Sequence, residues 1–251
     1  MRYTKGIWML GLLAVGCATA RPPQTTPVPA TLPQPVAAAT CDAPPEQAAP
    51  ARPAPIMTTR MLDVPSEFLH FTAPKVRKGM TAPDFALPLP DGAGQASLSM
   101  FRDKPTVLVF GSITCDRFRG SAGEVVALYN DFSGAANFLM VYIREAHATD
   151  EWIREVNESV GIRVKQPVSQ DERAGVARTC VNRLKLPFTT VVDDIDDTIS
   201  ETYGAWPERL YVIGTDGRIV YQGGQGPSGF RPAEVRALLL STYGATADAA
   251  R

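Results

Sequence analysis

The chain has 251 residues, 45% of them hydrophobic, and a formal net charge of −1 at neutral pH. That length allows one folded domain of about 150–180 residues plus additional segments. The near-neutral charge, without a basic run, argues against a nucleic-acid partner, because phosphate binding requires clustered lysine and arginine. The four cysteines are too few and too scattered for a disulfide framework or a zinc site: Cys17, Cys41, Cys115 and Cys180.

Residues 1–17 have the pattern of an export signal. A positive start is followed by an apolar stretch over residues 7–15 that is too short to span a bilayer, and small residues precede Cys17. The run from Ala14 to Cys17 resembles the lipobox of bacterial lipoproteins. The sequence therefore predicts lipidation of Cys17 and an exported protein anchored to a membrane of the bacterial cell envelope, facing the periplasm. A secretory peptide cut near residues 18–20 and an uncleaved anchor are the alternatives.

Residues 18–75 are predicted to form a disordered linker rich in proline and alanine, followed by an ill-defined lead-in. Residues 21–55 contain eleven of the 22 prolines, a composition typical of an extended, semi-rigid tether. Cys41 lies in this tether. Its presence is either incidental, or it acts as a mobile resolving thiol for a reactive cysteine elsewhere in the chain.

The folded domain is predicted over residues 76–246, with a short tail at 247–251. The pattern indicates a hairpin, a buried strand, a helix, a second buried strand, a second helix, a third strand, a second hairpin and a last helix. Their predicted ranges are 79–100, 106–110, 117–132, 137–143, 169–184, 189–192, 210–221 and 232–244. This order is the layout of a thioredoxin-like fold, an α/β architecture with a mixed central sheet and helices on both faces.

Cys115 lies between the first buried strand and the helix that follows it. The backbone N–H groups and the positive dipole end of that helix favour an anion, so the pKa of the thiol is expected to lie below its ordinary value of about 8.5. The alternative interpretation is a small buried hydrophobic residue that ends a strand. Cys180 is predicted on the inner face of its helix, where packing is favoured over a redox role.

Three motifs together resemble the iodothyronine deiodinase family. The run at 111–115, Gly-Ser-Ile-Thr-Cys, followed by Phe118, resembles the family's active-site sequence. The segment from Tyr142 to Trp152 resembles its Tyr-Ile-x-Glu-Ala-His-x-Ser-Asp-Gly-Trp segment. The stretches at 208–213 and 221–229 resemble its C-terminal signature. The motifs occur in the family's order over residues 105–240.

The resemblance implies an oxidoreductase in which Cys115, standing where vertebrate members have selenocysteine, is the nucleophile in a reductive dehalogenation of an iodothyronine or another halogenated phenol. It implies His147 and Glu145 as a proton relay, with His147 as an acid of near-neutral pKa that the glutamate orients or whose pKa it raises. The remaining positions carried over are Ser112, Thr114 and Tyr142 near the relay, and Arg209 and Phe118 as substrate contacts.

The resemblance implies a small-molecule substrate, no bound cofactor and no metal. An external thiol, either a thioredoxin-like protein or a low-molecular-weight dithiol, would act as reductant. The oligomeric state, a homodimer included, is left open. Three other functions compete: a peroxiredoxin-like thiol peroxidase, in which Cys115 becomes a sulfenic acid; thioredoxin-type disulfide exchange, disfavoured because no second cysteine follows Cys115 at C-x-x-C spacing; and an envelope-tethered binding module without enzymatic activity.

Overall fold

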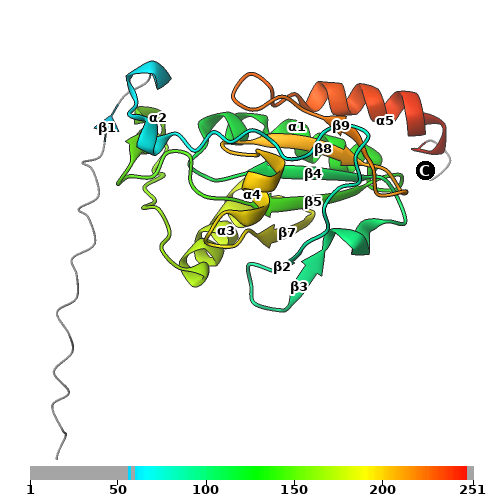
Figure 1. Cartoon of the computed structure of the whole chain (residues 1–251), viewed down its shortest axis with the longest axis horizontal. Helices are drawn as coiled ribbons and strands as arrows, with labels where there is room; N and C mark the ends of the chain where they lie inside the picture. Colours follow the sequence, from blue (N-terminus) through cyan, green and yellow to red (C-terminus); the bar gives the residue numbers. More distant parts are fainter. Residues whose placement is uncertain (1–55, 58–59, 248–251) are drawn as a thin grey trace, which may run out of the picture. The chain divides into compact units, whose positions relative to one another are not determined.

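A computed structural model of the chain describes residues 56–57 and 60–247 (Figure 1). The predicted signal peptide, the lipidation site Cys17 and Cys41 lie outside the described residues. Residues 60–75, predicted only as an ill-defined lead-in, place Val64 and Phe68 in the hydrophobic core. In the described part of the chain, no helix combines the length and the apolar character needed to cross a membrane.

A five-stranded mixed sheet forms the centre of the domain, in the order β7-β5-β4-β8-β9. Strands β4, β5 and β7 are parallel, whereas β8 runs antiparallel to β4 and to β9. A separate hairpin pairs β2 with β3, and β1 pairs with β6. The bounds are β1 Ile56–Met57, β2 Ala86–Pro88, β3 Gln95–Ser97, β4 Thr106–Gly111, β5 Asn137–Tyr142, β6 Trp152–Ile153, β7 Thr189–Val192, β8 Arg209–Ile213 and β9 Ile219–Gln222.

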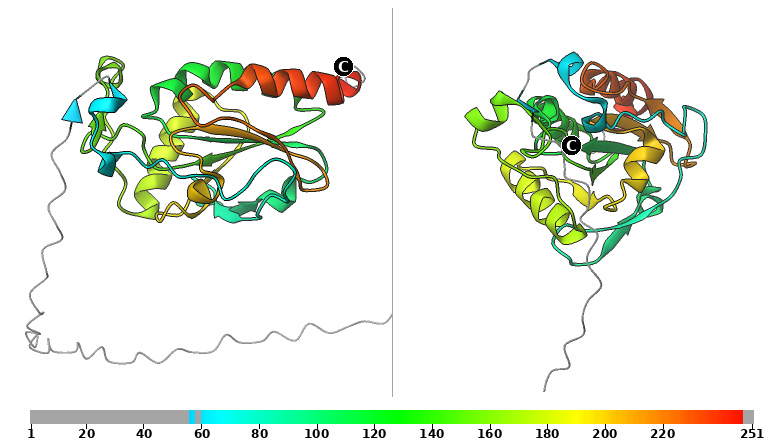
Figure 2. Two further views of the ribbon diagram at one scale, coloured as in Figure 1. Left: turned by 45° about the horizontal axis from the view of Figure 1, so that its top comes forward. Right: turned by 60° about the vertical axis from the view of Figure 1, so that its left-hand side comes forward.

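Helices cover both faces of this sheet, with α1, α3 and α5 on one side and α4 on the other (Figure 2). The α-helices are α1 Asp116–Phe132, α2 Glu155–Ser159, α3 Gln170–Leu184, α4 Thr198–Tyr203 and α5 Pro232–Ala247. Three short 3₁₀ helices span Met61–Asp63, Ser66–Phe68 and Leu98–Phe101. The predicted thioredoxin-like architecture, a mixed sheet between two helical layers, is confirmed.

The sequence pattern explains why these elements form where they do. Every residue of β4 is buried, as expected for a β-branched, apolar central strand. Helix α1 turns Val125, Leu128 and Phe132 inward at spacings of three and four. Helix α3 begins at the predicted cap, where the Ser169 side chain accepts a hydrogen bond from the Glu172 N–H. The last helix continues three residues beyond the predicted end at residue 244.

Candidate active site

Cys115 is the N-cap residue of α1, immediately beyond the tight turn that follows β4. Its Sγ accepts a hydrogen bond from the Phe118 N–H at 3.4 Å. The Phe118 ring packs back over the end of the strand, and a Cβ at Gly111 would lie 2.6 Å from it. Glycine at the start of the motif therefore permits the close approach that holds Cys115 at the helix terminus.

The Cys115 thiol also forms a hydrogen bond that the sequence motifs did not predict. Its Sγ donates to Oε2 of Glu208 at 2.8 Å. Cys115 is 1% exposed and Glu208 is fully buried, so the pair is shielded from bulk water. A Cβ at Gly226 would lie 2.1 Å from the Glu208 Oε1, which shows how closely the backbone encloses the carboxyl group.

In this environment the pKa of the Cys115 thiol shifts upward, which is opposite to the expected direction. Burial raises the pKa of the thiol well above its ordinary value, and the neighbouring Glu208 carboxylate raises it further. The Phe118 N–H at the helix terminus lowers it, but by less. The expectation of a depressed thiol pKa is therefore wrong, because desolvation and a close carboxylate outweigh the helix terminus. Burial likewise raises the pKa of Glu208, to about 7, against the lowering effect of the Cys115 hydrogen bond.

Three of the predicted site residues, Thr114, Tyr142 and Glu145, form one buried network next to Cys115, and Ser112 bonds to the same loop. The Glu145 carboxylate accepts hydrogen bonds from the Thr114 Oγ1 at 2.6 Å, from the Thr114 N–H at 3.0 Å and from the Tyr142 hydroxyl. Tyr142 Oη in turn accepts from the Ile113 N–H at 3.1 Å. Ser112 Oγ accepts from the Ala146 N–H at 3.2 Å. The network fixes residues 112–114 against the loop after β5.

Within the described residues, Thr114 links Glu145 to the backbone of His147. The Thr114 Oγ1 accepts a hydrogen bond from the His147 backbone N–H at 3.1 Å, whereas the imidazole Nε2 lies 3.6 Å from Asp116 Oδ1. Burial lowers the pKa of His147 to about 4, opposed by Asp116 and assisted by Arg154. The expected near-neutral acid is thus a neutral imidazole at physiological pH. Its ring packs edge-on against Trp152, with ring centroids 4.3 Å apart.

Cys115, Glu208 and His147 line a common cavity of about 210 Å³. Aromatic and apolar side chains form much of its wall, together with two acidic residues and two arginines. The other lining residues are Met61, Phe71, Asp116, Arg117, Trp152, Arg154, Pro207 and Pro227. A cavity with an apolar wall and a few convergent polar groups is the usual form of a small-molecule site.

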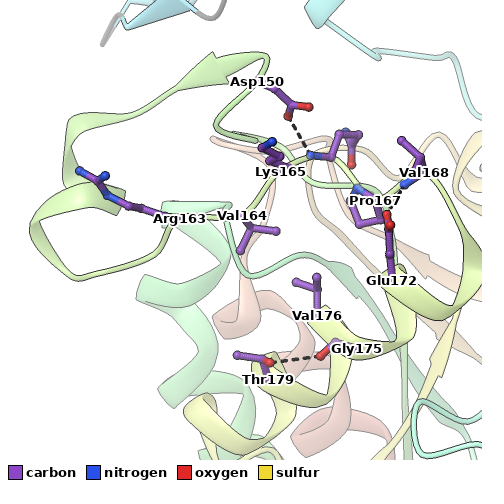
Figure 3. A pocket seen from close by; sticks show the side chains of 11 residues that line it. Asp150, Arg163, Val164, Lys165, Pro167, Val168, Glu172, Gly175, Val176 and Thr179 are labelled. Carbon is purple, nitrogen blue, oxygen red and sulfur yellow. Dashed lines mark hydrogen bonds between the residues drawn. The ribbon is translucent and has the colours of Figure 1, made fainter.

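A larger hollow of about 680 Å³ lies elsewhere, between the segment 163–168 and α3 (Figure 3). Asp150 there accepts a hydrogen bond from the Gln166 N–H at 2.8 Å, and Glu172 accepts from the Val168 N–H at 2.8 Å. Its lining contains no cysteine or histidine. Its acids therefore brace the loop, and the smaller cavity is the candidate active site.

Two residues predicted as substrate contacts are not among those that line the cavity. Arg209 is 6% exposed, and its guanidinium donates to the Tyr203 carbonyl at 3.1 Å. The Phe118 ring is 1% exposed and packs edge-on against Phe230. In this structure Arg209 braces α4 against β8, while Phe118 contributes its backbone N–H to Cys115. Cys180 is fully buried in the core, as packing on the inner face of α3 predicts.

Glu208 is the main site residue that sequence reasoning did not single out. It was present in the 208–213 motif, and a carboxylate directly before a fully buried strand is an uncommon feature that could have drawn attention to it. The described residues contain no group of three or more His, Cys, Asp or Glu side chains placed to hold a metal ion.

The fold and this site define a thioredoxin-like protein with one buried cysteine at the strand–helix junction and no C-x-x-C partner. The family model for iodothyronine deiodinase matches residues 56–243. The chain belongs to the iodothyronine deiodinase family.

Its relatives include vertebrate enzymes. The type I iodothyronine deiodinase of Xenopus laevis is 39% identical over 136 residues, covering 54% of this chain and 52% of the relative. The thyroxine 5-deiodinase of Bos taurus is 35% identical over 167 residues, covering 66% and 54%. The chain spans about half the length of the curated relatives it matches. A solved thiol:disulfide interchange protein from Bacteroides sp. is 16% identical, with a TM-score of 0.49 over 68% of this chain and 92% of that chain.

Proposed function

We propose that the protein is a thiol-dependent oxidoreductase that removes halogen from an aromatic substrate, an iodothyronine or another halogenated phenol, with Cys115 as the nucleophile. The observation that carries the proposal is the Cys115–Glu208 contact of 2.8 Å on the wall of a cavity that His147 also lines. Membership of the deiodinase family and the aromatic residues of the wall support the substrate class.

Glu208 acts as the base for Cys115 in this proposal. Its carboxylate already accepts the thiol hydrogen bond, and a pKa of about 7 suits a group that takes up and releases one proton near neutral pH. The buried thiol is therefore protonated at rest and ionises only when the proton passes to Glu208. This route replaces the permanent thiolate that the helix terminus alone would favour.

The halogen-transfer step needs no atoms or electrons beyond those of the thiol and the substrate. The sulfur bonds to the halogen, the electron pair of the broken carbon–halogen bond stays on carbon, and the thiol proton reaches that carbon through Glu208. The sum is E–SH + Ar–I → E–S–I + Ar–H. His147, as a neutral imidazole packed against Trp152, lines the same cavity and would orient the ring.

An external thiol completes the cycle. The first thiol attacks the sulfur and releases iodide with a proton, and the second reduces the resulting mixed disulfide: E–S–I + 2 RSH → E–SH + RSSR + HI. We propose a thioredoxin-like protein or a small dithiol for this role. Export, lipidation of Cys17 and a periplasmic location also remain proposals, since they depend on residues outside the described part of the chain.

The decisive experiment measures turnover of three substrate classes by purified protein with excess dithiol: an iodinated phenol, hydrogen peroxide and a mixed disulfide. We expect release of iodide and of the dehalogenated phenol in equal amounts, and loss of both with Cys115→Ser. Cys180→Ser, which leaves the cavity untouched, is the matched control. Faster turnover of peroxide would favour the thiol peroxidase alternative. No turnover of any class would favour the binding module.

A further inference from the structure

The segment between β5 and α3, residues 143–169, contacts the residues around Cys115 at several points. In this segment, Trp152 packs against the His147 ring, and Arg154 Nη2 lies 3.2 Å from Asp116 Oδ2, directly after Cys115. Three residues after Arg154, in α2, Asn157 is 2% exposed. Its side chain contacts the backbone that immediately precedes Cys115.

Asn157 makes two hydrogen bonds with opposite polarity. Its Nδ2 donates to the Thr114 carbonyl at 2.7 Å, and its Oδ1 accepts from Arg119 Nη2 at 2.6 Å. A guanidinium can only donate and a carbonyl can only accept, so one orientation of the amide satisfies both partners. The side chain is therefore fixed between α1 and the active-site turn.

Arg119 binds the neighbouring carbonyl of the same turn. Its Nη1 donates to the Ile113 carbonyl, so the two consecutive carbonyls before Cys115 are both bound by side chains. Buried carbonyls without hydrogen-bond donors are unfavourable. If the two carbonyls lost their donors, the turn would therefore rearrange to form other hydrogen bonds. The direction of the Cys115 Sγ depends on the backbone of this turn.

We propose that Asn157 is a positioning residue that holds the turn at 113–114 so that the Cys115 thiol meets Glu208. Its catalytic consequence rests on the proposed function, whereas its effect on the thiol does not. Without the amide donor, the turn relaxes, the thiol gains solvent and leaves the carboxylate. Both changes favour thiolate formation in the free protein while they remove the proton acceptor from the reaction.

The test compares Asn157→Ala and Asn157→Asp with wild type. Aspartate keeps the acceptor for Arg119 but loses the donor to Thr114, and its negative charge alone would disfavour a nearby thiolate. Glu158→Gln, on the same short helix, is the matched control because Glu158 pairs with Arg163 instead of the active-site turn. The readout is the pH dependence of Cys115 alkylation by iodoacetamide, followed by mass spectrometry of the Cys115 peptide, together with the melting temperature.

We expect the midpoint of alkylation to fall by about one pH unit or more in both Asn157 variants and to stay unchanged in Glu158→Gln. A lower melting temperature with an unchanged midpoint would mean that Asn157 only stabilises the fold, and would overturn the proposal. If Asn157→Ala does not fold, Asn157→Asp still decides, because it conserves size and the Arg119 contact.

Turnover separates this inference from the proposed function. If wild type dehalogenates, the Asn157 variants should lose kcat by about tenfold or more with little change in KM. If wild type does not dehalogenate but the alkylation midpoint shifts, the proposed function fails and the positioning role stands. If wild type dehalogenates and the variants match it in both readouts, the positioning role fails.

Discussion

The Cys115 Sγ lies 2.8 Å from Oε2 of Glu208, although 93 positions separate the two residues in the chain. The antiparallel pairing of β4 with β8 brings them together. Phe110, near the end of β4, pairs with Arg209 at the start of β8, so Cys115 and Glu208 lie beyond the same end of the two paired strands. The thiol therefore meets a carboxyl group whose pKa of about 7 allows proton exchange near neutrality. Next to burial, this contact shifts the pKa of the Cys115 thiol more than the hydrogen bond at the helix terminus does.

Replacing Glu208 with glutamine should remove the proton acceptor while keeping the shape of the side chain. We expect kcat for dehalogenation to fall by about 10²-fold or more, with a small effect on KM, because general-base contributions are typically of this size. The pKa of the Cys115 thiol should fall at the same time, since a neutral amide no longer opposes the thiolate. Steady-state kinetics and alkylation rates measure the two effects.

Glu201→Gln on the exposed side of α4 is the matched control for this substitution and should leave both quantities unchanged. A Glu208→Gln variant with wild-type turnover would show that another group accepts the thiol proton.

Stability should depend on pH through Glu208. Its pKa is raised from 4.5 to about 7 on folding, so the folded state binds the proton more tightly than the unfolded state. The resulting stabilisation is fully present below about pH 4.5 and is lost as the pH rises through 7. Relative to Glu208→Gln, wild type should lose about 3 kcal/mol of unfolding free energy between pH 4.5 and 8.5.

Urea denaturation at these two pH values, with wild type compared against the variant, measures the difference. The comparison cancels the contributions of Asp193, whose pKa is also raised, and of His147, whose pKa is lowered. Parallel pH profiles for the two proteins would contradict the raised pKa of Glu208.

His147 should remain neutral across the physiological range. Burial lowers its pKa to about 4, and Asp116 opposes this shift. Asp116→Asn should therefore lower the pKa further, whereas Arg154→Gln should raise it, because Arg154 lowers the pKa of His147 in the wild type. NMR titration of the imidazole C–H resonances from about pH 3 to 8 provides the measurement. A midpoint near 6.5 in the wild type would return His147 to the role of a proton donor at neutral pH.

Gly226→Ala should damage the site without touching a reacting atom. The added Cβ would lie 2.1 Å from the Glu208 Oε1, so the carboxyl group must move away. We expect a loss of kcat similar to that of Glu208→Gln, accompanied by a lower thiol pKa.

The same substitution at Gly123 serves as the control, since a Cβ there meets no atom within 4 Å. Alanine at this interior position of α1 should instead stabilise the helix by about 0.5–1 kcal/mol. Wild-type activity in Gly226→Ala would show that the carboxyl group can shift and still accept the thiol proton.

The amino-acid sequence alone determined the order of the central strands and the long helices, and the place of the cysteine, but it did not predict α2, α4 or the pairing of β1 with β6. Buried apolar runs such as 107–110 and helical spacing such as Val125, Leu128 and Phe132 are local signals, and the structure follows them. The resemblance of three motifs was sufficient to identify the family. It also located the cluster of Tyr142, Glu145 and Thr114, whose members lie close together in the chain or at the ends of the adjacent parallel strands β4 and β5.

Only the tertiary structure decided the electrostatics of the site. The pairing of β8 with β4 buried Glu208 against the thiol and turned Arg209 away from the cavity. The segment between β5 and α3 brought Asn157 to the turn before Cys115. Local sequence indicates that Cys115 lies at a helix terminus, which favours a thiolate. It does not reveal the burial of the thiol or the carboxylate, distant in the chain, that together outweigh this effect on the pKa. Both depend on contacts between segments far apart in the chain, and for that reason the direction of the Cys115 pKa could not be predicted from the sequence.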